Sequence, residues 1–206
     1  MKIRSRRNDK RDISKGISIK MNAKGTKLPG VLIFEPDVFS DERGFFLETW
    51  NSTRYENAGI RSPFVQDNVS FSQKGVLRGL HFQYPQSQGK LVQVLSGQVL
   101  DVAVDIRVGS PTFGQWVSEV LSDANHRQIY IPPSFAHGYC VTSETAVFSY
   151  KCTDFYNPAT ESGIIWNDPD LNIDWPIKEP VLSPKDANYP GLKDLPPDKL
   201  PHFRRL

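Results

Sequence analysis

Apolar and polar residues alternate along most of the chain, which is the period of a β-strand with one buried face. The clearest case is QVLDVAVDIR, residues 98–107, in which every second residue from Leu100 to Ile106 is apolar. Asp101 and Asp105 fall at the positions between them. This segment predicts a half-buried strand whose two aspartates lie on the opposite face from the apolar side chains.

Nine further segments have a strand-like pattern, and turn residues such as Gly75, Tyr84-Pro85 and Pro132-Pro133 separate them. The segments are 31–34, 44–50, 64–72, 76–83, 90–96, 115–121, 128–131, 135–142 and 145–153. Short strands at such close spacing favour an all-β sandwich or barrel over alternating strands and helices.

Helical patterning is confined to one short segment, residues 51–58. Asn51 or Ser52 is suited to cap its start, and Gly59 to end it. Beyond Trp175 the chain is rich in proline and weakly periodic, so we expect an irregular C-terminal segment packed over the sheet.

The net charge of +2 at pH 7 conceals an asymmetry along the chain. Residues 1–27 carry ten Lys or Arg against two Asp or Glu, whereas the remainder has an acidic excess. We interpret 1–27 as a basic, flexible arm and 28–206 as a single domain. The arm lacks aromatic residues and helical periodicity, which disfavours a nucleic-acid or membrane partner. Translation from Met21 is the alternative that would remove most of the basic excess.

The composition is that of a globular protein, with 38% hydrophobic and 23% charged residues. Apolar runs do not approach the roughly 20 residues of a membrane helix, and no apolar stretch follows the basic N-terminus as in a secretory leader. Cys140 and Cys152 lie in strand-like segments. We therefore expect reduced core thiols and a cytoplasmic protein.

Three histidines lie in or near the predicted strands: His81 in RGLHFQ, His137 in SFAHGY and His126 in a polar turn. A metal site would need three or more ligands converging on one point. The position two residues beyond His81, which shares its face of a strand, is Gln83, and Lys90 follows where an acidic ligand would be needed. The sequence therefore predicts no metal and no cofactor.

Lys90 and His81 together suit proton abstraction beside a ketone. A nearby cation keeps an imidazole neutral and able to accept a proton, and it stabilises negative charge developing on a carbonyl oxygen. A hydrogen-bonded structural histidine and a solvated lysine are the alternatives.

Tyr150 shares one face of a predicted strand with Ala146, Phe148 and Cys152, so its hydroxyl needs either a structural hydrogen bond or a role in a pocket. Spacing alone does not choose the acidic partner that would orient His81. The candidates by chemistry are Asp168, Asp170, Asp174 and Asp186.

Between about Pro29 and Asp186 the chain contains an ordered series of motifs, namely FSDERGFFLETW, FVQDNVSFS, GVLRGLHFQ, QGKLVQVLSGQVLDVAVDIR, SPTFGQW, IPPSFAHGY, YKCTDFY, ESGIIWNDP, IDWP and LSPKDA. On these motifs the sequence resembles the deoxythymidine-diphosphate (dTDP)-4-dehydrorhamnose 3,5-epimerase family. It implies a cupin jelly roll that works as a homodimer without a metal, on a dTDP-linked 4-keto-6-deoxyhexose.

The resemblance also implies roles for individual residues. His81 of RGLH is the general base, and Asp186 of LSPKD holds it. Lys90 lies near the keto oxygen, and Tyr150 donates a proton on the other face of the sugar. The substrate-binding positions that the resemblance implies are Arg43, Glu48, Gln66, Asn68, Arg78, His137, Tyr156, Glu161 and Lys185.

Two alternatives to double epimerisation remain open. One is a related enzyme that inverts only C3 or C5, or moves the ketone; the other is a non-catalytic cupin that binds a sugar nucleotide. Strict strand alternation also places Arg78 and His81 on opposite faces, so a shared substrate requires a bulge, for which Gly79 is suited.

Overall fold

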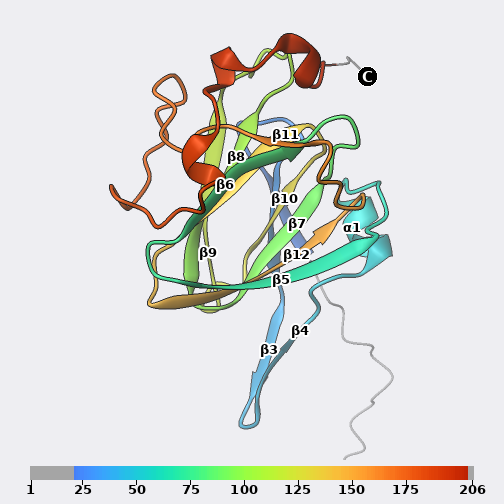
Figure 1. The fold of residues 1–206 in the computed structure, drawn as a ribbon. Helices are drawn as coiled ribbons and strands as arrows, with labels where there is room; N and C mark the ends of the chain where they lie inside the picture. Colours follow the sequence, from blue (N-terminus) through green and yellow to red (C-terminus); the bar gives the residue numbers. More distant parts are fainter. Residues whose placement is uncertain (1–20, 204–206) are drawn as a thin grey trace, which may run out of the picture.

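A computed structural model describes residues 21–203, which form two antiparallel β-sheets packed face to face (Figure 1). In spatial order, the six-stranded sheet contains β1 (Met21–Gly25), β2 (Leu32–Pro36), β10 (Gln128–Ile131), β7 (Lys90–Ser96), β12 (Thr145–Cys152) and β5 (Gln66–Gln73). The five-stranded sheet contains β13 (Glu161–Gly163), β6 (Leu77–Gln83), β11 (Phe135–Val141), β8 (Gln98–Asp105) and β9 (Trp116–Ser122). The predicted all-β fold is confirmed.

Each of the ten predicted strands is present, two with the predicted boundaries (90–96 and 128–131) and the others with boundaries shifted by a few residues, and residues 21–203 contain three further strands that were not predicted. One of these is β1, which pairs with β2. Residues 21–25, which we assigned to the basic arm, therefore belong to the sheet. The rest of the arm that precedes them, residues 1–20, lies outside the described residues.

The main core fills the space between the two sheets. Val92, Val94 and Phe148 point inward from the six-stranded sheet, and Val99 and Val141 point inward from the five-stranded sheet. Each is buried, and burying an aliphatic or aromatic side chain of this size contributes roughly 1.5–3 kcal/mol. This alternation of inward residues is what holds the two sheets together.

Strand β8 is buried on both faces, which corrects the half-buried strand expected there. Its apolar face, including Val102 and Val104, packs under Trp175 and other residues of the C-terminal segment. The opposite face points between the sheets, where Asp101 and Asp105 are 0% exposed. The tail covers the face that water would otherwise wet. Asp101 accepts from His137 of β11, and Asp105 accepts from residues that follow β8.

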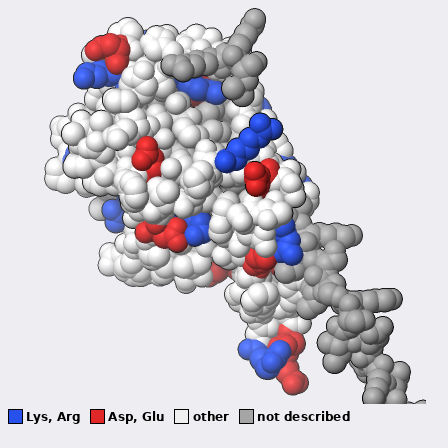
Figure 2. Space-filling model, turned by 90° about the vertical axis from the view of Figure 1, so that its right-hand side faces the viewer, with Lys and Arg blue, Asp and Glu red and all other residues white. Residues whose placement is uncertain are grey.

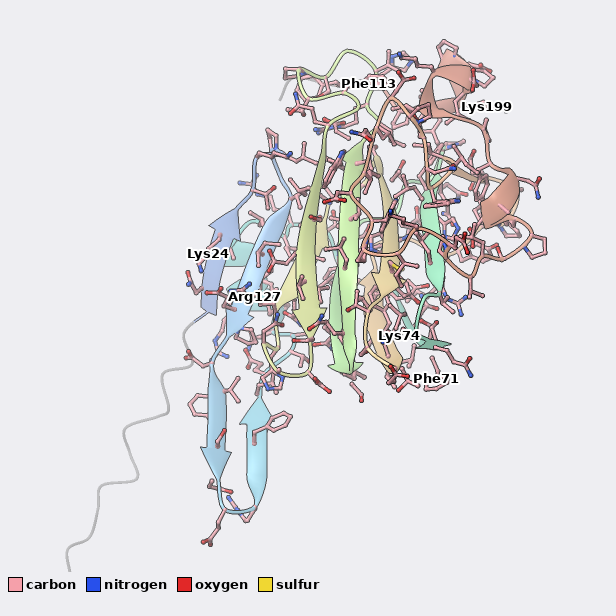
Figure 3. All side chains as sticks on the ribbon, turned by 90° about the vertical axis from the view of Figure 1, so that its left-hand side faces the viewer. Lys24, Phe71, Lys74, Phe113, Arg127 and Lys199 are labelled. Carbon is pink, nitrogen blue, oxygen red and sulfur yellow. The ribbon has the colours of Figure 1, made fainter. Side chains whose placement is uncertain are left out.

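A two-stranded hairpin, β3 (Val38–Asp41) and β4 (Gly44–Leu47), projects away from the body in two different views (Figures 1 and 3). The predicted strand 44–50 thus ends at Leu47. Phe45 and Phe46 are 60% and 64% exposed on this hairpin. A small group of charged side chains lies at its end (Figure 2).

Helix α1 (Ser52–Asn57) follows the hairpin as predicted. The Asn51 side chain caps it by accepting from the Arg54 N–H, and Gly59, at φ +114°, lies just beyond its end. Tyr55 anchors it in a small cluster with Phe34 and Tyr130. Three one-turn 3-10 helices lie in the C-terminal segment: η1 (Asp186–Asn188), η2 (Leu192–Asp194) and η3 (Pro197–Lys199). Among residues 21–203, no helix has the length and apolar character to cross a bilayer.

Candidate active site

Two adjoining cavities open between the sheets, and they share three side chains: His81, Lys90 and Tyr150. The larger has a volume of about 190 Å³ and the smaller about 90 Å³. His81 comes from β6, whereas Lys90 and Tyr150 come from β7 and β12 of the facing sheet. Three of the four residues predicted to be catalytic therefore surround one space.

A bulge in β6 brings Arg78 and His81 to the same cavity, as predicted. In the pairing of β6 with β11, His81 opposes His137 and Arg78 opposes Tyr139, so two residues of β6 face the single residue between them on β11. Gly79 takes φ +131° in the bulge. A Cβ atom there would lie 2.5 Å from a backbone atom of β11, so the close approach requires glycine.

Asp186 is the carboxylate that pairs with His81. Its Oδ1 atom accepts a hydrogen bond from Nε2 of the imidazole. The other three candidates lie elsewhere: Asp168 accepts from backbone N–H groups, Asp170 pairs with a lysine of the C-terminal segment, and Asp174 is exposed. With Nε2 donating to Asp186, Nδ1 carries the free lone pair, and it makes no hydrogen bond with a described residue.

The electrostatics of Asp186 favour its ionised form. Burial raises the pKa of this carboxyl, but the hydrogen bonds from His81 and Ser183 outweigh burial, and the net pKa lies below the usual value. An ionised carboxylate holds the imidazole in one tautomer and stabilises the imidazolium that forms on proton transfer.

Lys90 lies inside the cavity and faces the Tyr150 ring, with Nζ 5.8 Å from the ring centre. Among residues 21–203 its ammonium has no hydrogen-bond or ion-pair partner. Burial lowers the pKa of Lys90, while Cys152, Asp101 and Glu161 act in the opposite direction. This cation is therefore free to interact with an oxygen of a bound molecule.

Tyr150 points inward from β12 between Phe148 and Lys90. Burial is the main cause that raises the pKa of its phenol to about 12. The phenol therefore keeps its proton near neutral pH, as a proton donor must.

His137 lies at the inner wall of the larger cavity and donates from Nε2 to Asp101 over 2.8 Å. Burial lowers the pKa of this imidazole, against the opposing charge of Asp101. This second His–Asp pair makes His137 a neutral, oriented side chain beside His81.

The remaining predicted residues on the cavity side form its rim. Glu161 accepts from the Tyr156 hydroxyl at 2.7 Å and pairs with Lys185. Gln66 accepts from the Tyr156 N–H and donates to Asn68, which opposes Tyr150 across the strand pair. Tyr156 and Glu161 line the smaller cavity, and hydrogen bonds or an ion pair connect the other three to them.

Arg43 and Glu48 do not lie at this site within one copy of the chain. Arg43 is on the projecting hairpin, where it pairs with Asp41 and its side chain is 85% exposed. Glu48 pairs with Arg54 of α1. Neither lines either cavity.

Sequence reasoning missed several residues of the site. Ser70, Tyr139 and Phe148 also line the larger cavity. Each lies two residues from a predicted site residue on the same strand, so the period of two could have identified them. Ser183 and Tyr189, which contact the His81–Asp186 pair, come from the irregular tail, where no periodic signal exists.

The described residues contain no group of three His, Cys, Asp or Glu side chains that could hold a metal ion. Gln83, at the position where a ligand would be needed, instead anchors a loop. Its amide donates to the carbonyls of Gln86 and Phe155 and accepts from the Asn157 N–H.

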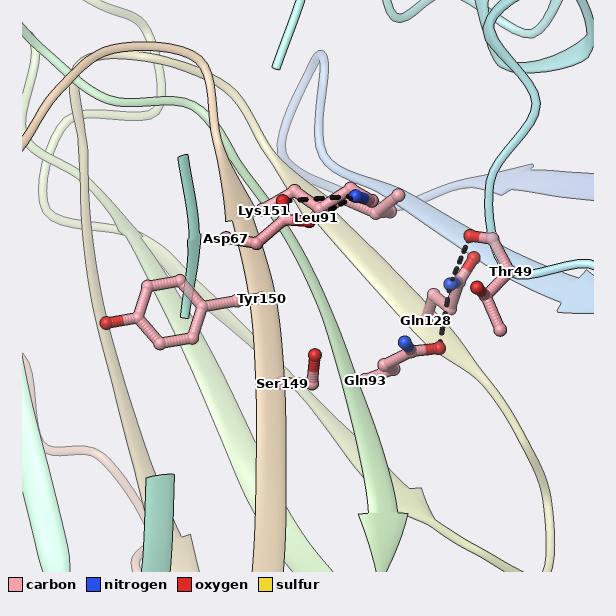
Figure 4. A pocket seen from close by; sticks show the side chains of 8 residues that line it. All are labelled: Thr49, Asp67, Leu91, Gln93, Gln128, Ser149, Tyr150 and Lys151. Atoms are coloured by element: carbon pink, nitrogen blue, oxygen red, sulfur yellow. Dashed lines mark hydrogen bonds and ion pairs between the residues drawn. The ribbon is translucent and has the colours of Figure 1, made fainter. Parts of the chain in front are cut away.

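A polar hollow of about 190 Å³ lies on the other side of β12, and the Tyr150 ring points away from its glutamines (Figure 4). Its groups bond one another: Lys151 pairs with Asp67, and Gln128 donates to Gln93 and to a backbone carbonyl. Such mutual pairing leaves little for a substrate to bind.

The sequence profile of the dTDP-4-dehydrorhamnose 3,5-epimerase family matches residues 25–194. The chain belongs to this family. The Pseudomonas aeruginosa enzyme of that name is 57% identical over 176 residues, covering 84% of this chain and 97% of the relative. That of Shigella flexneri is 56% identical over 170 residues, covering 82% and 94%.

Solved structures of this epimerase family share the fold. The RmlC epimerase of Legionella pneumophila, in complex with dTDP-4-keto-L-rhamnose, superposes with a TM-score of 0.88 at 54% identity, covering 90% of this chain and all of the other. ChmJ of Streptomyces bikiniensis, a 3′-monoepimerase, has a TM-score of 0.77 at 34% identity, covering 82% and 86%. The predicted family and its cupin jelly roll are both confirmed.

Proposed function

We propose that this protein converts dTDP-4-dehydro-6-deoxy-D-glucose to dTDP-4-dehydro-L-rhamnose by inverting C3 and C5. The observation that carries the proposal is the meeting of His81, Lys90 and Tyr150 in one space, with His81 oriented by Asp186. A base, an oxyanion partner and a proton donor are the three groups that epimerisation beside a ketone requires.

The first step is abstraction of the proton from C3 or C5, which the C4 ketone acidifies. Nδ1 of His81 takes the proton, and the electron pair of the C–H bond moves to the C4 oxygen as an enolate. Asp186 stabilises the resulting imidazolium. Positioned general bases typically contribute about 10²–10⁴-fold.

Lys90 then stabilises the enolate oxygen. In the described part of the chain its ammonium has no ion-pair or hydrogen-bond partner, and charge interactions are stronger away from bulk water. No redox change occurs, because the electron pair returns to carbon in the next step.

Tyr150 completes the inversion by giving its hydroxyl proton to the same carbon from the opposite face. The phenolate regains a proton from solvent and His81 releases one, so each cycle leaves only an inverted centre. The facing strands place Tyr150 and His81 on two sides of the cavity, which suits a donor opposite a base.

Binding of the nucleotide and phosphates is assigned to the polar residues of the two cavities and their rim. These residues are Gln66, Asn68, Arg78, His137, Tyr156, Glu161 and Lys185. No metal takes part in this proposal, and activity is expected to persist in chelator. A loss of activity in chelator that one divalent ion reverses would contradict it.

We also propose a homodimer in which each hairpin serves the partner copy. Arg43 lies on the projecting hairpin, away from its own cavities. Phe45 and Phe46 on the hairpin, and Val69 and Phe71 on the outer face of β5, are exposed apolar residues that a second copy would cover (Phe71 is labelled in Figure 3). We place the dimer in the cytoplasm, where the two unpaired cysteines would stay reduced.

Incubation with the 4-keto sugar nucleotide in deuterated water tests the function. We expect deuterium at both C3 and C5 and formation of the L-rhamno product. Label at one carbon only would identify a single epimerase, like the relative that acts at C3. Binding without any label would identify a non-catalytic sugar-nucleotide cupin.

A further inference from the structure

Asp186 must be held rigidly to orient His81, yet it lies outside both sheets. It is the first residue of η1, a single turn of 3-10 helix in the irregular tail. Its Oδ1 atom is engaged by His81. What holds its second oxygen therefore determines how firmly the pair is fixed.

The Ser183 hydroxyl makes two hydrogen bonds to Asp186. Ser183 Oγ donates to Asp186 Oδ2 over 2.8 Å and accepts from the Asp186 backbone N–H over 3.1 Å. The backbone N–H of Gly79, in the bulge of β6, also stabilises the Asp186 carboxylate. The carboxylate is thus bound from its own turn and from the strand that carries the base.

The Ser183 side chain contributes little else to the structure. The residue is exposed and belongs to none of the apolar clusters, and the Ala187 N–H bonds to its carbonyl rather than to its side chain. Removing the hydroxyl therefore takes away the two Asp186 contacts and leaves packing intact.

We propose that Ser183 is a positioning residue for the epimerisation, whose hydroxyl locks the Asp186 carboxylate so that the free nitrogen of His81 faces the sugar. This inference rests on the proposed function. Without the hydroxyl, the carboxylate can rotate about its side-chain bonds and share its negative charge differently with the imidazole. A serine that only caps the 3-10 turn would change local stability and leave the chemistry unchanged.

Three variants separate these roles. Ser183→Ala removes the hydroxyl, Ser183→Thr keeps it, and Ser118→Ala removes an exposed hydroxyl on β9 that makes no hydrogen bond with a described residue. For Ser183→Ala we expect kcat to fall about 10- to 100-fold, the range for losing a hydrogen bond to a charged group. KM and the thermal midpoint should match those of Ser118→Ala, and Ser183→Thr should recover most of kcat.

The pH profile of kcat/KM gives a readout that capping alone would not move. Ser183→Ala leaves in place the charged and titratable groups that face the His81–Asp186 pair, namely Arg78, Lys90, His137, Tyr139, Tyr150, Tyr156, Glu161, Lys185 and Tyr189. Loss of a hydrogen bond that favours the carboxylate raises the proton affinity of the pair. The acid limb should therefore move to higher pH in Ser183→Ala only.

A kcat for Ser183→Ala within twofold of wild type, or equal losses in the alanine and threonine variants, would overturn the proposal. The imidazole N–H signal of His81 in substrate-free protein, measured by ¹⁵N-histidine NMR, is independent of turnover. If the wild type converts no substrate, the proposed function fails. The NMR signal then still tests the role of Ser183, because an unchanged signal in Ser183→Ala shows that Ser183 does not hold the His81–Asp186 pair.

Discussion

At the scale of single residues, burial sets the protonation state of the groups that face the substrate. The same desolvation that raises the pKa of the Tyr150 phenol lowers the pKa of the Lys90 ammonium. The Tyr150 phenol therefore loses its proton less readily, and the Lys90 ammonium is poorly solvated. Both changes serve a reaction in which charge appears on an oxygen between them.

Tyr150→Phe is expected to separate proton exchange from inversion. The substitution removes one hydroxyl and preserves the ring volume, so the core should survive. His81 and Lys90 can still form the enolate, and His81 can return solvent deuterium to the same face. We expect deuterium at C3 or C5 with little epimer, measured by NMR of the sugar.

Tyr84→Phe is the matched control, because its ring lies in the outer core and its hydroxyl has no hydrogen bond with a described residue. Normal epimerisation by Tyr150→Phe would make that tyrosine structural. Loss of both exchange and inversion would place its hydroxyl earlier in the reaction.

At the scale of elements, the bulge of β6 connects the fold to the chemistry. One extra residue turns Arg78 toward the face that carries His81. The feature was predictable, because two site residues three positions apart cannot share a face of a regular strand. The contact between the Gly79 N–H of this bulge and the Asp186 carboxylate was not predictable, because it depends on where the C-terminal segment meets β6.

Gly79→Ala is expected to destabilise the protein more than a comparable glycine substitution. Both Gly79 and Gly109 have positive φ, but a Cβ at Gly109 meets nothing within 4 Å. Backbone strain alone should cost Gly109→Ala about 1 kcal/mol, and overpacking should bring Gly79→Ala to about 3 kcal/mol. Urea unfolding measures both, and equal losses would show that the bulge relaxes around the added methyl.

Asp105 illustrates what the alternating pattern of β8 could not reveal. The side chain accepts from Arg107, Ser110 and Thr112 inside the fold. The sequence marks the aspartates as polar but does not say that a proline-rich tail covers the other face. Polar periodicity therefore identified the strand and misassigned its environment.

Asp105→Asn is expected to cost about 3 kcal/mol of unfolding free energy at pH 7, as for a broken buried ion pair. Burial raises the pKa of Asp105, but its hydrogen bonds bring it below the usual value. A depressed folded-state pKa gives stability that is present above about pH 4 and lost as pH falls through the folded pKa.

The difference between Asp105→Asn and wild type should therefore shrink below about pH 4. Asp198→Asn, which alters an exposed carboxylate, is the control and should change stability little at either pH. A difference that does not vary with pH would show that Asp105 is not ionised in the folded protein.

At the scale of the whole molecule, two predicted binding residues lie outside the cavities of their own chain, one on the hairpin and one directly after it. Arg43 and Glu48 came from a resemblance that assigns residues to a site without saying which copy supplies them. Single-chain patterns predicted the sandwich and most of the cavity well. They could not distinguish a residue that serves its own cavity from one that serves a partner's.

Subunit mixing tests the shared site. Arg43→Ala and His81→Ala should each lose most activity alone. If Arg43 serves the partner copy, a co-expressed mixed dimer contains one intact site, and a random mixture should regain about a quarter of wild-type activity. No recovery in a mixture shown to contain mixed dimers would return Arg43 to its own chain or to no role.

The His81–Asp186 pair joins residues 105 positions apart. A ribosome that adds about 5–20 residues per second completes β6 roughly 5–20 s before it adds the carboxylate. During that interval β7 to β13 are added, and after Gly163 every strand of the sandwich has been made while the imidazole still has no partner. The growing chain can therefore hold the complete set of strands while it still lacks the group that orients its base, so catalysis begins only with the tail.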